Sequence, residues 1–251
     1  MKPARDWDAA TYDRVADPQE EWARDVLERL ELRGDETVLD AGCGSGRVTR
    51  LLVERVPRGR VIGVDASASM IASAREALGD RAELIVSDIL DLELTEPVDA
   101  IFSNATFHWI LDHRRLFARL HALLGAGGQL EAQCGGIGNV EEFLNTLESV
   151  NGDERFAPYL RGIASTWNFA SPGDTELRLR AAGFEAVRCW LERRRGQPRD
   201  ARAYLQAVCL GPHLHRLPPE LHPTYIDAVL EAIPRPFTLD YVRLNISAKR
   251  A

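Results

Sequence analysis

The densest cluster of glycines in the chain directly follows an apolar run, in the stretch TVLDAGCGSGRVTR at residues 37–50. Glycine loses more backbone entropy on folding than any other residue, so three glycines within five positions indicate a sharp bend or a close approach to another group. The preceding residues, TVLDA, are β-branched and apolar, as in a buried strand of a parallel sheet. This stretch therefore predicts a strand that ends in a tight glycine turn and leads into a helix.

Strand-like and helix-like segments alternate from residue 37 to residue 134. Further strands are predicted at 60–65, 82–88, 98–104 and 127–134, and helices at 46–56, 67–78 and 112–124. Ser67 is a plausible N-cap of the second of these helices, and Gly79 follows its end. The order predicts an α/β fold with a doubly wound, mostly parallel sheet and crossover helices on both faces.

The flanking segments add a cover and a cap to this core. We expect an N-terminal helical cover at 1–33, a ligand-binding core at 34–138, and the rest of the core sheet at 139–251 with edge strands at about 184–195 and 236–249. Inserted helices at about 139–182 and 198–235 form the expected helical cap. These helices are short and are joined by the glycine-containing segments CGGIGN and RRRGQP, so we expect a mobile cover without a core of its own.

Composition narrows the classes of protein. The 251 residues carry a net charge of −7, whereas a protein dedicated to nucleic acids normally has a basic surplus. The four cysteines are scattered and form no C-x-x-C pair, which favours reduced thiols over disulfides or a zinc site. The first residues lack the apolar core of a signal peptide, and no apolar run reaches 18 residues. We expect a soluble cytoplasmic protein, a monomer or homodimer, without nucleic-acid or membrane partners.

The spacing of the glycines bears on the ligand. A dinucleotide fingerprint reads G-x-G-x-x-G, but here the pattern is G-x-G-x-G and Arg47 stands where the third glycine would be. Asp65, at the end of the second strand, suits the two hydroxyls of a ribose, which NAD also offers. Asp40, two residues before the first glycine, favours a cationic ligand part over a pyrophosphate. These features disfavour a nicotinamide-dependent oxidoreductase, which stays as the rival class.

Four segments in order, LDAGCGSG, VIGVDASASMIASAR, IVSDI and IFSNATFHWI, resemble the class I S-adenosylmethionine-dependent methyltransferases, and most closely the trans-aconitate methyltransferase group. The resemblance covers roughly residues 5–135 well and the remainder loosely. It implies a seven-stranded Rossmann-like methyltransferase fold, S-adenosyl-L-methionine as the cofactor, and a small molecule as the methyl acceptor.

The same resemblance implies a role for each matching residue. Asp40, Gly42 and Gly44 would lie along the methionine part of the cofactor. Asp65 would hold the ribose. Tyr12, in the segment YDRVA, would close over the site as part of the cofactor-covering segment.

The remaining implied contacts concern the adenine and the reactive end of the cofactor. Ala66 and Met70 would lie against the adenine face, and Asp88 would accept a hydrogen bond from the adenine amine with the Ile89 backbone nearby. Asn104 would face the sulfonium. Two simpler interpretations stay open: Met70 as a core residue of its helix, and Asp88 as the N-cap of the short turn that follows it.

The methyl acceptor is less well defined by the sequence. Methylation of amines on nucleic-acid bases typically shows a [DN]-P-P-[YF] box after the fourth strand, and this chain has NATF there. No carboxylate cluster suggests a metal. A carboxylate acceptor is ionised at neutral pH and needs no base, whereas a hydroxyl or ring-nitrogen acceptor leaves His108 as the candidate base. His108 is equally explained by hydrogen bonding within its loop.

We therefore expect an S-adenosylmethionine-dependent methyltransferase that acts on a small molecule, with O-methylation of a carboxylate as the leading subtype. Methylation of a hydroxyl, nitrogen or carbon atom, and binding of the cofactor without catalysis, stay as alternatives. A carboxylate-bearing acceptor needs a cation near the sulfonium. One or two of seven arginines in and around the expected cap would then point inward: Arg155, Arg161, Arg193, Arg194, Arg195, Arg199 and Arg235.

Overall fold

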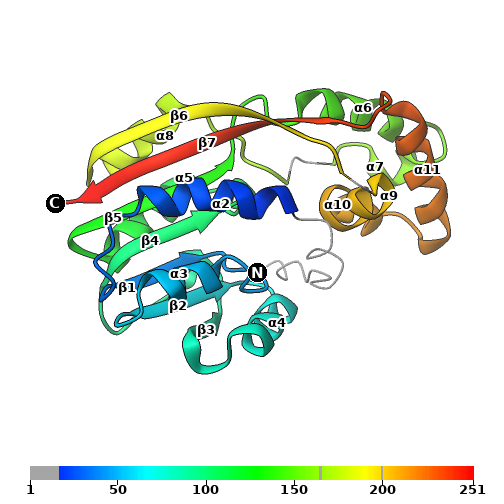
Figure 1. The fold of residues 1–251 in the computed structure, drawn as a ribbon. Coiled ribbons are helices and arrows are strands. Elements are labelled where there is room, and N and C mark those ends of the chain that lie inside the picture. The colour runs from blue at the N-terminus through cyan, green and yellow to red at the C-terminus, as the bar shows by residue number, and fades with distance from the viewer. Residues whose placement is uncertain (1–16, 164–165, 199) are drawn as a thin grey trace.

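A computed structural model describes residues 17–163, 166–198 and 200–251 of the chain (Figure 1). Within these residues seven strands form one sheet in the order β3-β2-β1-β4-β5-β7-β6. Their bounds are β1 Thr37–Ala41, β2 Arg60–Asp65, β3 Glu83–Val86, β4 Val98–Asn104, β5 Leu124–Gly135, β6 Phe184–Gly196 and β7 Leu239–Arg250. Strands β1 to β5 are mutually parallel, and β7 runs antiparallel between β5 and β6. The expected doubly wound, mostly parallel sheet is confirmed.

The α-helices of the described residues range from 4 to 13 residues in length. Their bounds are α2 Asp17–Arg29, α3 Thr49–Arg55, α4 Ala68–Leu78, α5 His113–Leu123, α6 Glu141–Asn151, α7 Ala157–Leu160, α8 Pro172–Ala181, α9 Ala201–Tyr204, α10 Gly211–Leu214 and α11 His222–Ala232. Short turns of 3-10 helix occur at η1 Gly79–Arg81, η2 Ile89–Asp91, η3 Phe107–Trp109 and η5 Pro219–Leu221, and η4 Leu205–Cys209 is π-helical. As the sequence predicts, the Ser67 side chain caps α4 by accepting a hydrogen bond from the Met70 amide at 3.3 Å.

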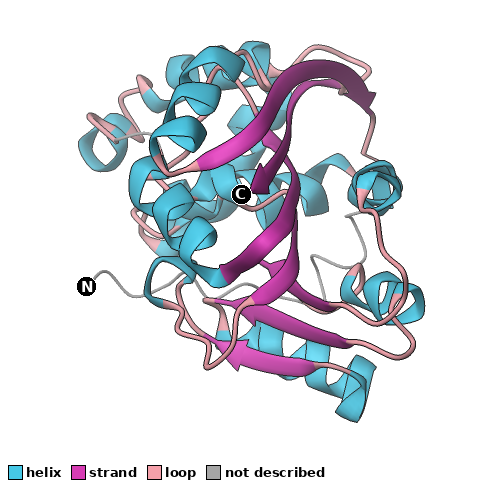
Figure 2. Cartoon of the chain, turned by 90° about the vertical axis from the view of Figure 1, so that its left-hand side faces the viewer, coloured by secondary structure: helices cyan, strands magenta, loops and turns pink. Residues whose placement is uncertain are grey.

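Helices cover both faces of the twisted sheet (Figure 2). On one face, buried side chains of α2 and α3 pack against Val38, Val61 and Phe102 of the strands. On the other face, α5 and α8 enclose a larger cluster with Leu39, Ile62 and other strand residues. Alternate residues of each central strand thus enter different cores, which is why these strands read as continuous apolar runs. Strand β1, which leads into the glycine turn, is therefore packed by a hydrophobic core on each face of the sheet.

The helices between β5 and β7 do not all belong to the cap. Helix α8, inside the segment 139–182 that was expected to form a cap, packs on the sheet instead, and its Leu179 is fully buried in the core beneath it. We therefore use the name cap for α6, α7, α9, α10 and α11 with their connecting loops. This cap lies beyond one end of the sheet (Figure 1).

The cap has a hydrophobic core of its own, contrary to the expectation from its short helices. Buried side chains of α6, α9 and α11, including the fully buried Tyr225, form one cluster. Short helices succeed here because several of them share a single core. Strand β7 joins the two cores, since Leu239 and Tyr241 lie in the cap cluster while Leu244 and Ile246 lie in the sheet core. No helix in the described part of the chain is long and apolar enough to cross a membrane.

Candidate active site

The glycine turn after β1 folds back onto the end of β2. The amides of Gly42 and Cys43 both donate to the Val64 carbonyl, at 2.8 and 3.0 Å. Gly42 has a φ of +91°, and a Cβ atom there would lie 2.1 Å from Oγ1 of Thr106. Gly44 has a φ of +55°, and a Cβ atom there would meet nothing within 4 Å. The first glycine is thus required by packing, whereas the second exposes bare backbone to open space.

Asp65, at the carboxyl end of β2, organises the turn. Its Oδ2 accepts a hydrogen bond from the Gly44 amide at 3.0 Å, and its Oδ1 accepts one from the Ser67 amide at 2.9 Å. Burial raises the pKa of this carboxyl, and the backbone N–H groups partly counteract the rise. The amides of Ser67, Gly44 and Ala66 all act on this carboxylate, and a carboxylate with its two oxygens still has acceptor capacity left for a ligand.

Asp40 lies deeper in the same corner, in β1. It is 1% exposed and accepts a hydrogen bond from Oγ1 of Thr49, the first residue of α3, at 2.7 Å. Burial raises the pKa of Asp40 to about 7; the Thr49 bond lowers it and the nearby charge of Asp65 raises it further. A cation placed beside Asp40 would stabilise its ionised form. Thr49 belongs to none of the sequence motifs, so its contact with Asp40 was not predicted.

The loop after β4 forms the facing wall of the turn. Ser103 Oγ donates to the Ala41 carbonyl at 2.6 Å, and Thr106 Oγ1 donates to the Gly42 carbonyl at 3.3 Å. Ala105 between them has a left-handed φ of 57°, an unfavourable conformation for a residue with a Cβ atom. Asn104 lies at the last position of β4, half-buried, next to this turn.

His108 lies in η3, behind that wall. It is 8% exposed, and its Nδ1 accepts a hydrogen bond from the Gly135 amide at 3.2 Å, so the ring proton resides on Nε2. Burial lowers the pKa of His108 well below its usual range, and the positive charge of Arg243 lowers it further. The imidazole is therefore neutral at physiological pH, with one donor nitrogen and one acceptor nitrogen that is already engaged.

The other implied adenine contacts occupy diverse environments. Ala66 is exposed just after β2, and Met70 is 4% exposed within α4. Asp88 is exposed and caps η2, with Oδ1 accepting from the Leu90 amide at 2.9 Å, while Ile89 is buried in the sheet core. The two simpler interpretations of Met70 and Asp88 thus describe what these side chains do within the protein itself. Tyr12 lies outside the described residues.

A buried polar network at the adjoining end of β5 and β7 was not foreseen. Arg243, 3% exposed, pairs in register with Gly135, and its Nε donates to Oε1 of Gln133 at 3.2 Å. Gln133 in turn donates to Oδ1 of Asn245 at 3.0 Å, and the guanidinium lies 5.1 Å from the ring centre of Trp22. In the sequence these residues look like ordinary members of alternating strands. Only the pairing of β5 with β7 brings them beside His108.

The arginines named from the sequence lie elsewhere. Arg155, Arg194 and Arg195 make ion pairs with Asp153, Asp25 and Asp240 respectively. Arg161, Arg193 and Arg235 are exposed, and Arg199 lies outside the described residues. Arg161 lines a pocket in the cap, and a different arginine, Arg243, is buried beside His108 in the loop after β4.

The cysteine within the glycine turn, Cys43, is buried and has a thiol of low reactivity. Cys43 is 7% exposed, and burial together with the charges of Asp40 and Asp65 raises the pKa of its thiol well above the usual range. A thiol that resists ionisation is a poor nucleophile. Its small side chain packs near Gly63, where an added Cβ would lie 3.0 Å from its sulfur.

The donor set of this corner fits a nucleoside joined to a cationic amino acid. Asp65 offers two carboxylate oxygens for a ribose, the bare backbone at Gly44 leaves room for a ligand, and the buried Asp40 lacks a full counter-charge. A pyrophosphate would face two carboxylates here and would be repelled. These features, on the carboxyl edge of an open α/β sheet, are those expected of a methyltransferase that uses S-adenosylmethionine.

Comparisons with known proteins specify the family. A family model described as a methyltransferase domain matches residues 38–128. A trans-aconitate 2-methyltransferase of Azoarcus sp. is 35% identical over 234 residues, covering 88% of this chain and 87% of the relative. One from Variovorax paradoxus is 32% identical over 238 residues, covering 88% and 86%. The chain belongs to the trans-aconitate 2-methyltransferase family, and S-adenosylmethionine is its methyl donor.

Solved structures agree at the level of the fold. The phosphoethanolamine N-methyltransferase 2 of Haemonchus contortus in complex with S-adenosyl-L-methionine superposes with a TM-score of 0.58 at 20% identity, covering 92% of this chain and 52% of that chain. A mycolic acid cyclopropane synthase superposes with a TM-score of 0.60 at 18% identity, covering 94% and 85%. The expected Rossmann-like methyltransferase fold is thereby confirmed.

Proposed function

We propose that this enzyme transfers the methyl group of S-adenosylmethionine to a carboxylate oxygen of a small organic acid, of the kind for which its trans-aconitate relatives are named. The bound cofactor supplies an electrophilic methyl carbon on a sulfonium. A carboxylate oxygen attacks that carbon, the carbon–sulfur bond breaks, and a methyl ester and S-adenosylhomocysteine result. No proton is lost, because the acid is already ionised at neutral pH.

The state of His108 is the observation that carries this proposal. It is the one ionisable side chain of residues 104–109, and its acceptor nitrogen is occupied by the Gly135 amide. A neutral imidazole with an engaged Nδ1 is poorly placed to remove a proton from a hydroxyl, but its Nε2–H is able to donate to an anionic oxygen. In this proposal His108 orients the acceptor as a hydrogen-bond donor rather than as a base.

Electrostatics near His108 also favour an anionic acceptor. The Arg243 guanidinium is close enough to lower the pKa of His108, so its positive field extends to that ring. Methyl transfer by displacement depends mainly on alignment and on the exclusion of water. A carboxylate held in the positive field of Arg243 would be aligned without a general base.

For the cofactor, we assign the ribose to Asp65, the cationic methionine end to Asp40, and the close backbone approach to Gly42 and Gly44. Asn104 is proposed to face the sulfonium, beside the strained turn at Ala105. Ala66, Met70, Asp88, Ile89 and Tyr12 are proposed to complete the adenine side and the cover. The supporting observation for Asp65 is the position of its carboxylate at the end of β2 beside Gly44, and for Asp40 it is the raised pKa.

The test measures product formation with trans-aconitate, other small di- and tricarboxylates, a phenol and an amine, each with saturating S-adenosylmethionine. Methyl esters of the acids, identified by mass spectrometry, are expected. Their rate should be flat between about pH 6 and 9, because carboxylates titrate near pH 4. Products from the phenol or amine alone, with a rate that rises with pH, would contradict the proposal.

Two variants test the role of His108. His108→Gln retains an N–H donor, whereas His108→Ala retains none, and we expect only the second to lower kcat by about tenfold or more. If His108 were a base, both variants would lose activity and the remaining rate would depend steeply on pH.

A further inference from the structure

The cap contains a cavity that the proposed methyl transfer does not use. It has a volume of about 480 Å³ and lies between α6, α7, α10 and the described residues 161–163 and 166–167. Most of its wall is apolar and is formed by Leu144, Leu147, Ala157, Leu160, Ile163 and Pro212. The two charged residues that also line it, Glu148 and Arg161, are exposed to solvent. An apolar cavity of about 150 Å³ is enough to take up benzene, so this one has room for a larger ring or a short chain.

One polar side chain in this apolar wall has an unused hydrogen-bonding atom. His213, in α10, lines the cavity and is 4% exposed, and its Nδ1 has no hydrogen-bond partner among the residues that the structure describes. Its ring stacks on Tyr225 with centres 5.9 Å apart. Burial lowers the pKa of His213 to about 4, so the imidazole is neutral at physiological pH. Buried polar groups normally find a partner, so an unpaired one beside a cavity is a sign of a missing group.

A hydrogen bond positions the Tyr225 ring that stacks on His213. Tyr225 donates its hydroxyl hydrogen to Oδ1 of Asn151 at 2.7 Å, and Asn151 also lines the cavity. The Tyr225 ring packs edge-on against the fully buried Phe156 as well. The Tyr225 ring on which His213 stacks is therefore held by Asn151 and by Phe156, and this contact positions the imidazole beside the cavity.

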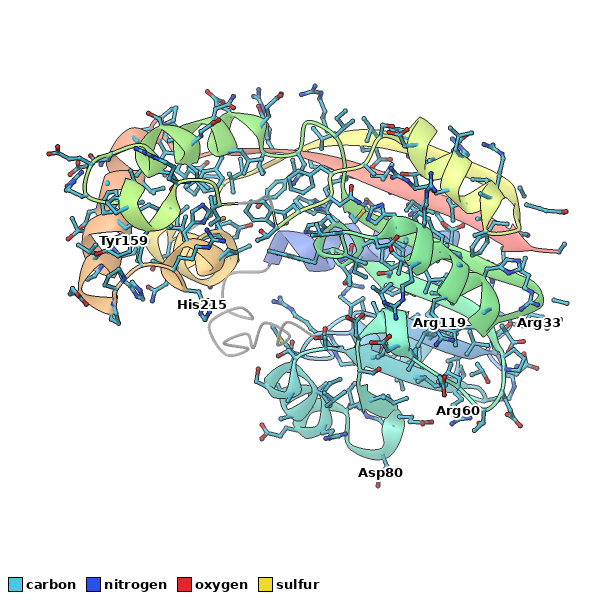
Figure 3. The ribbon with its side chains drawn as sticks, turned by 180° about the vertical axis from the view of Figure 1, so that it is seen from behind. Arg33, Arg60, Asp80, Arg119, Tyr159 and His215 are labelled. Atoms are coloured by element: carbon cyan, nitrogen blue, oxygen red, sulfur yellow. The ribbon has the colours of Figure 1, made fainter. Side chains whose placement is uncertain are left out.

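The cavity shares one wall with the loop that carries His108. Trp167 lines the cavity, and its ring centre lies 5.6 Å from that of Trp109. The next residue, Asn168, donates its amide hydrogen to the His108 carbonyl at 2.8 Å, and the Phe169 ring lies 5.8 Å from the His108 ring. In the view from behind, Tyr159 of α7 and His215 after α10 mark the part of the cap that surrounds the cavity (Figure 3).

We propose that the cap cavity binds a small apolar molecule, a ring or short chain that carries one neutral hydrogen-bonding group such as a hydroxyl, with that group paired to His213. A neutral imidazole in an apolar wall does not offset the cost of burying an ion, so the paired group is uncharged. The proposal goes beyond the methyl transfer proposed above and does not depend on which atom is methylated, because binding is measured directly.

Two probes of equal shape test the pairing with His213. 4-Cresol and p-xylene differ by a hydroxyl in place of a methyl group, and each is titrated calorimetrically into the whole chain with S-adenosylhomocysteine present. We expect 4-cresol to bind the native protein about tenfold more tightly, the effect of one hydrogen bond to a buried group. His213→Phe keeps a ring stacked on Tyr225, and should abolish the preference for 4-cresol while leaving p-xylene unaffected.

A cavity-filling variant tests the place of binding. Leu144→Trp puts a larger side chain into the wall and should weaken both probes at least tenfold, whereas Leu177→Trp, at a position 68% exposed on α8, should change neither. Bound probe should also change the fluorescence of the Trp167–Trp109 pair. Failure of both probes to bind the native protein, equal binding to Leu144→Trp, or a preference for 4-cresol that survives in His213→Phe would overturn the proposal. If Leu144→Trp does not fold, the His213→Phe comparison decides alone.

Discussion

Replacement of Asp65 by alanine is the most direct test of how the cofactor is held. In the protein alone, each carboxylate oxygen of Asp65 accepts one backbone hydrogen bond, from Gly44 at 3.0 Å and from Ser67 at 2.9 Å. The Ala66 amide also acts on this carboxylate, and the acceptor capacity that remains is proposed to bind the two hydroxyls of a ribose. Alanine removes both acceptors and leaves these N–H groups without their partner.

The expected loss of affinity follows from these contacts. A hydrogen bond to a charged group contributes about 1.5–3 kcal/mol where it is fully buried. Asp65 is partly exposed, and water competes for its oxygens, so we take about 1 kcal/mol for each ribose hydroxyl. Together they give about 2 kcal/mol, or about thirtyfold weaker binding of S-adenosylhomocysteine.

Calorimetry at pH 8.5 measures this loss under conditions in which Asp40 is ionised in both proteins. This choice matters because the charge of Asp65 raises the pKa of Asp40, so its removal would favour ionisation of Asp40 near neutral pH. Asp80→Ala is the matched control: it removes the same charge from the far end of α4, where Asp80 is exposed (Figure 3), and should leave the affinity unchanged.

A fall in melting temperature without a fall in affinity would refute the reasoning. It would mean that Asp65 only shapes the glycine turn and makes no contact with the cofactor. Tight binding of NADH by the native protein would refute the wider assignment of the site.

Three further predictions concern the same corner of the sheet. The pKa of Asp40 is about 7 in the folded, cofactor-free protein and about 4 in the unfolded chain, so between these pH values the native state binds more protons. The free energy of unfolding should therefore fall as pH rises from about 4 to 7. Asp40→Asn should flatten this pH dependence, as measured by urea unfolding. Gly42→Ala should lower the melting temperature, because the added Cβ would clash with Thr106. Gly44→Ala should keep the fold but weaken cofactor binding, as measured by calorimetry. Cys43 should stay unmodified by a thiol reagent at pH 8 until the protein unfolds, and rapid labelling of the native protein would contradict its protonated state.

The sequence predicts the core of this fold well because its signals are local. The run TVLDA with its glycines, the cap at Ser67 and the apolar face of each helix all depend on neighbours within a few positions. Such patterns fix strand and helix type before any tertiary contact is known. Asp40 and Asp65 were found for the same reason, since each stands at the end of a strand with a fixed spacing to the glycines.

The parts that sequence reasoning missed depend on pairing between distant segments. Arg243 lies 110 positions from its hydrogen-bond partner Gln133, and the two meet only because β7 is inserted antiparallel beside β5. The core of the cap is likewise assembled from α6, α9 and α11, which are separated in the chain by other elements and by strand β6. Helix α8 shows the converse: its position in the chain resembles that of the cap helices, but its buried Leu179 belongs to the sheet core.

The raised pKa values of Asp40 and Asp65 link stability to binding. Both carboxyls resist ionisation because they are buried, and each lies in the field of the other. A fold selected for stability alone would place neutral side chains here, since an unpaired buried charge is costly. A cationic ligand beside Asp40 reverses this cost, because its charge favours the ionised carboxylate and thereby drives proton release on binding. In the proposed site, the same pair that lowers the stability of the cofactor-free protein above pH 7 would therefore favour a cationic cofactor, and a dinucleotide with its pyrophosphate would gain nothing from it.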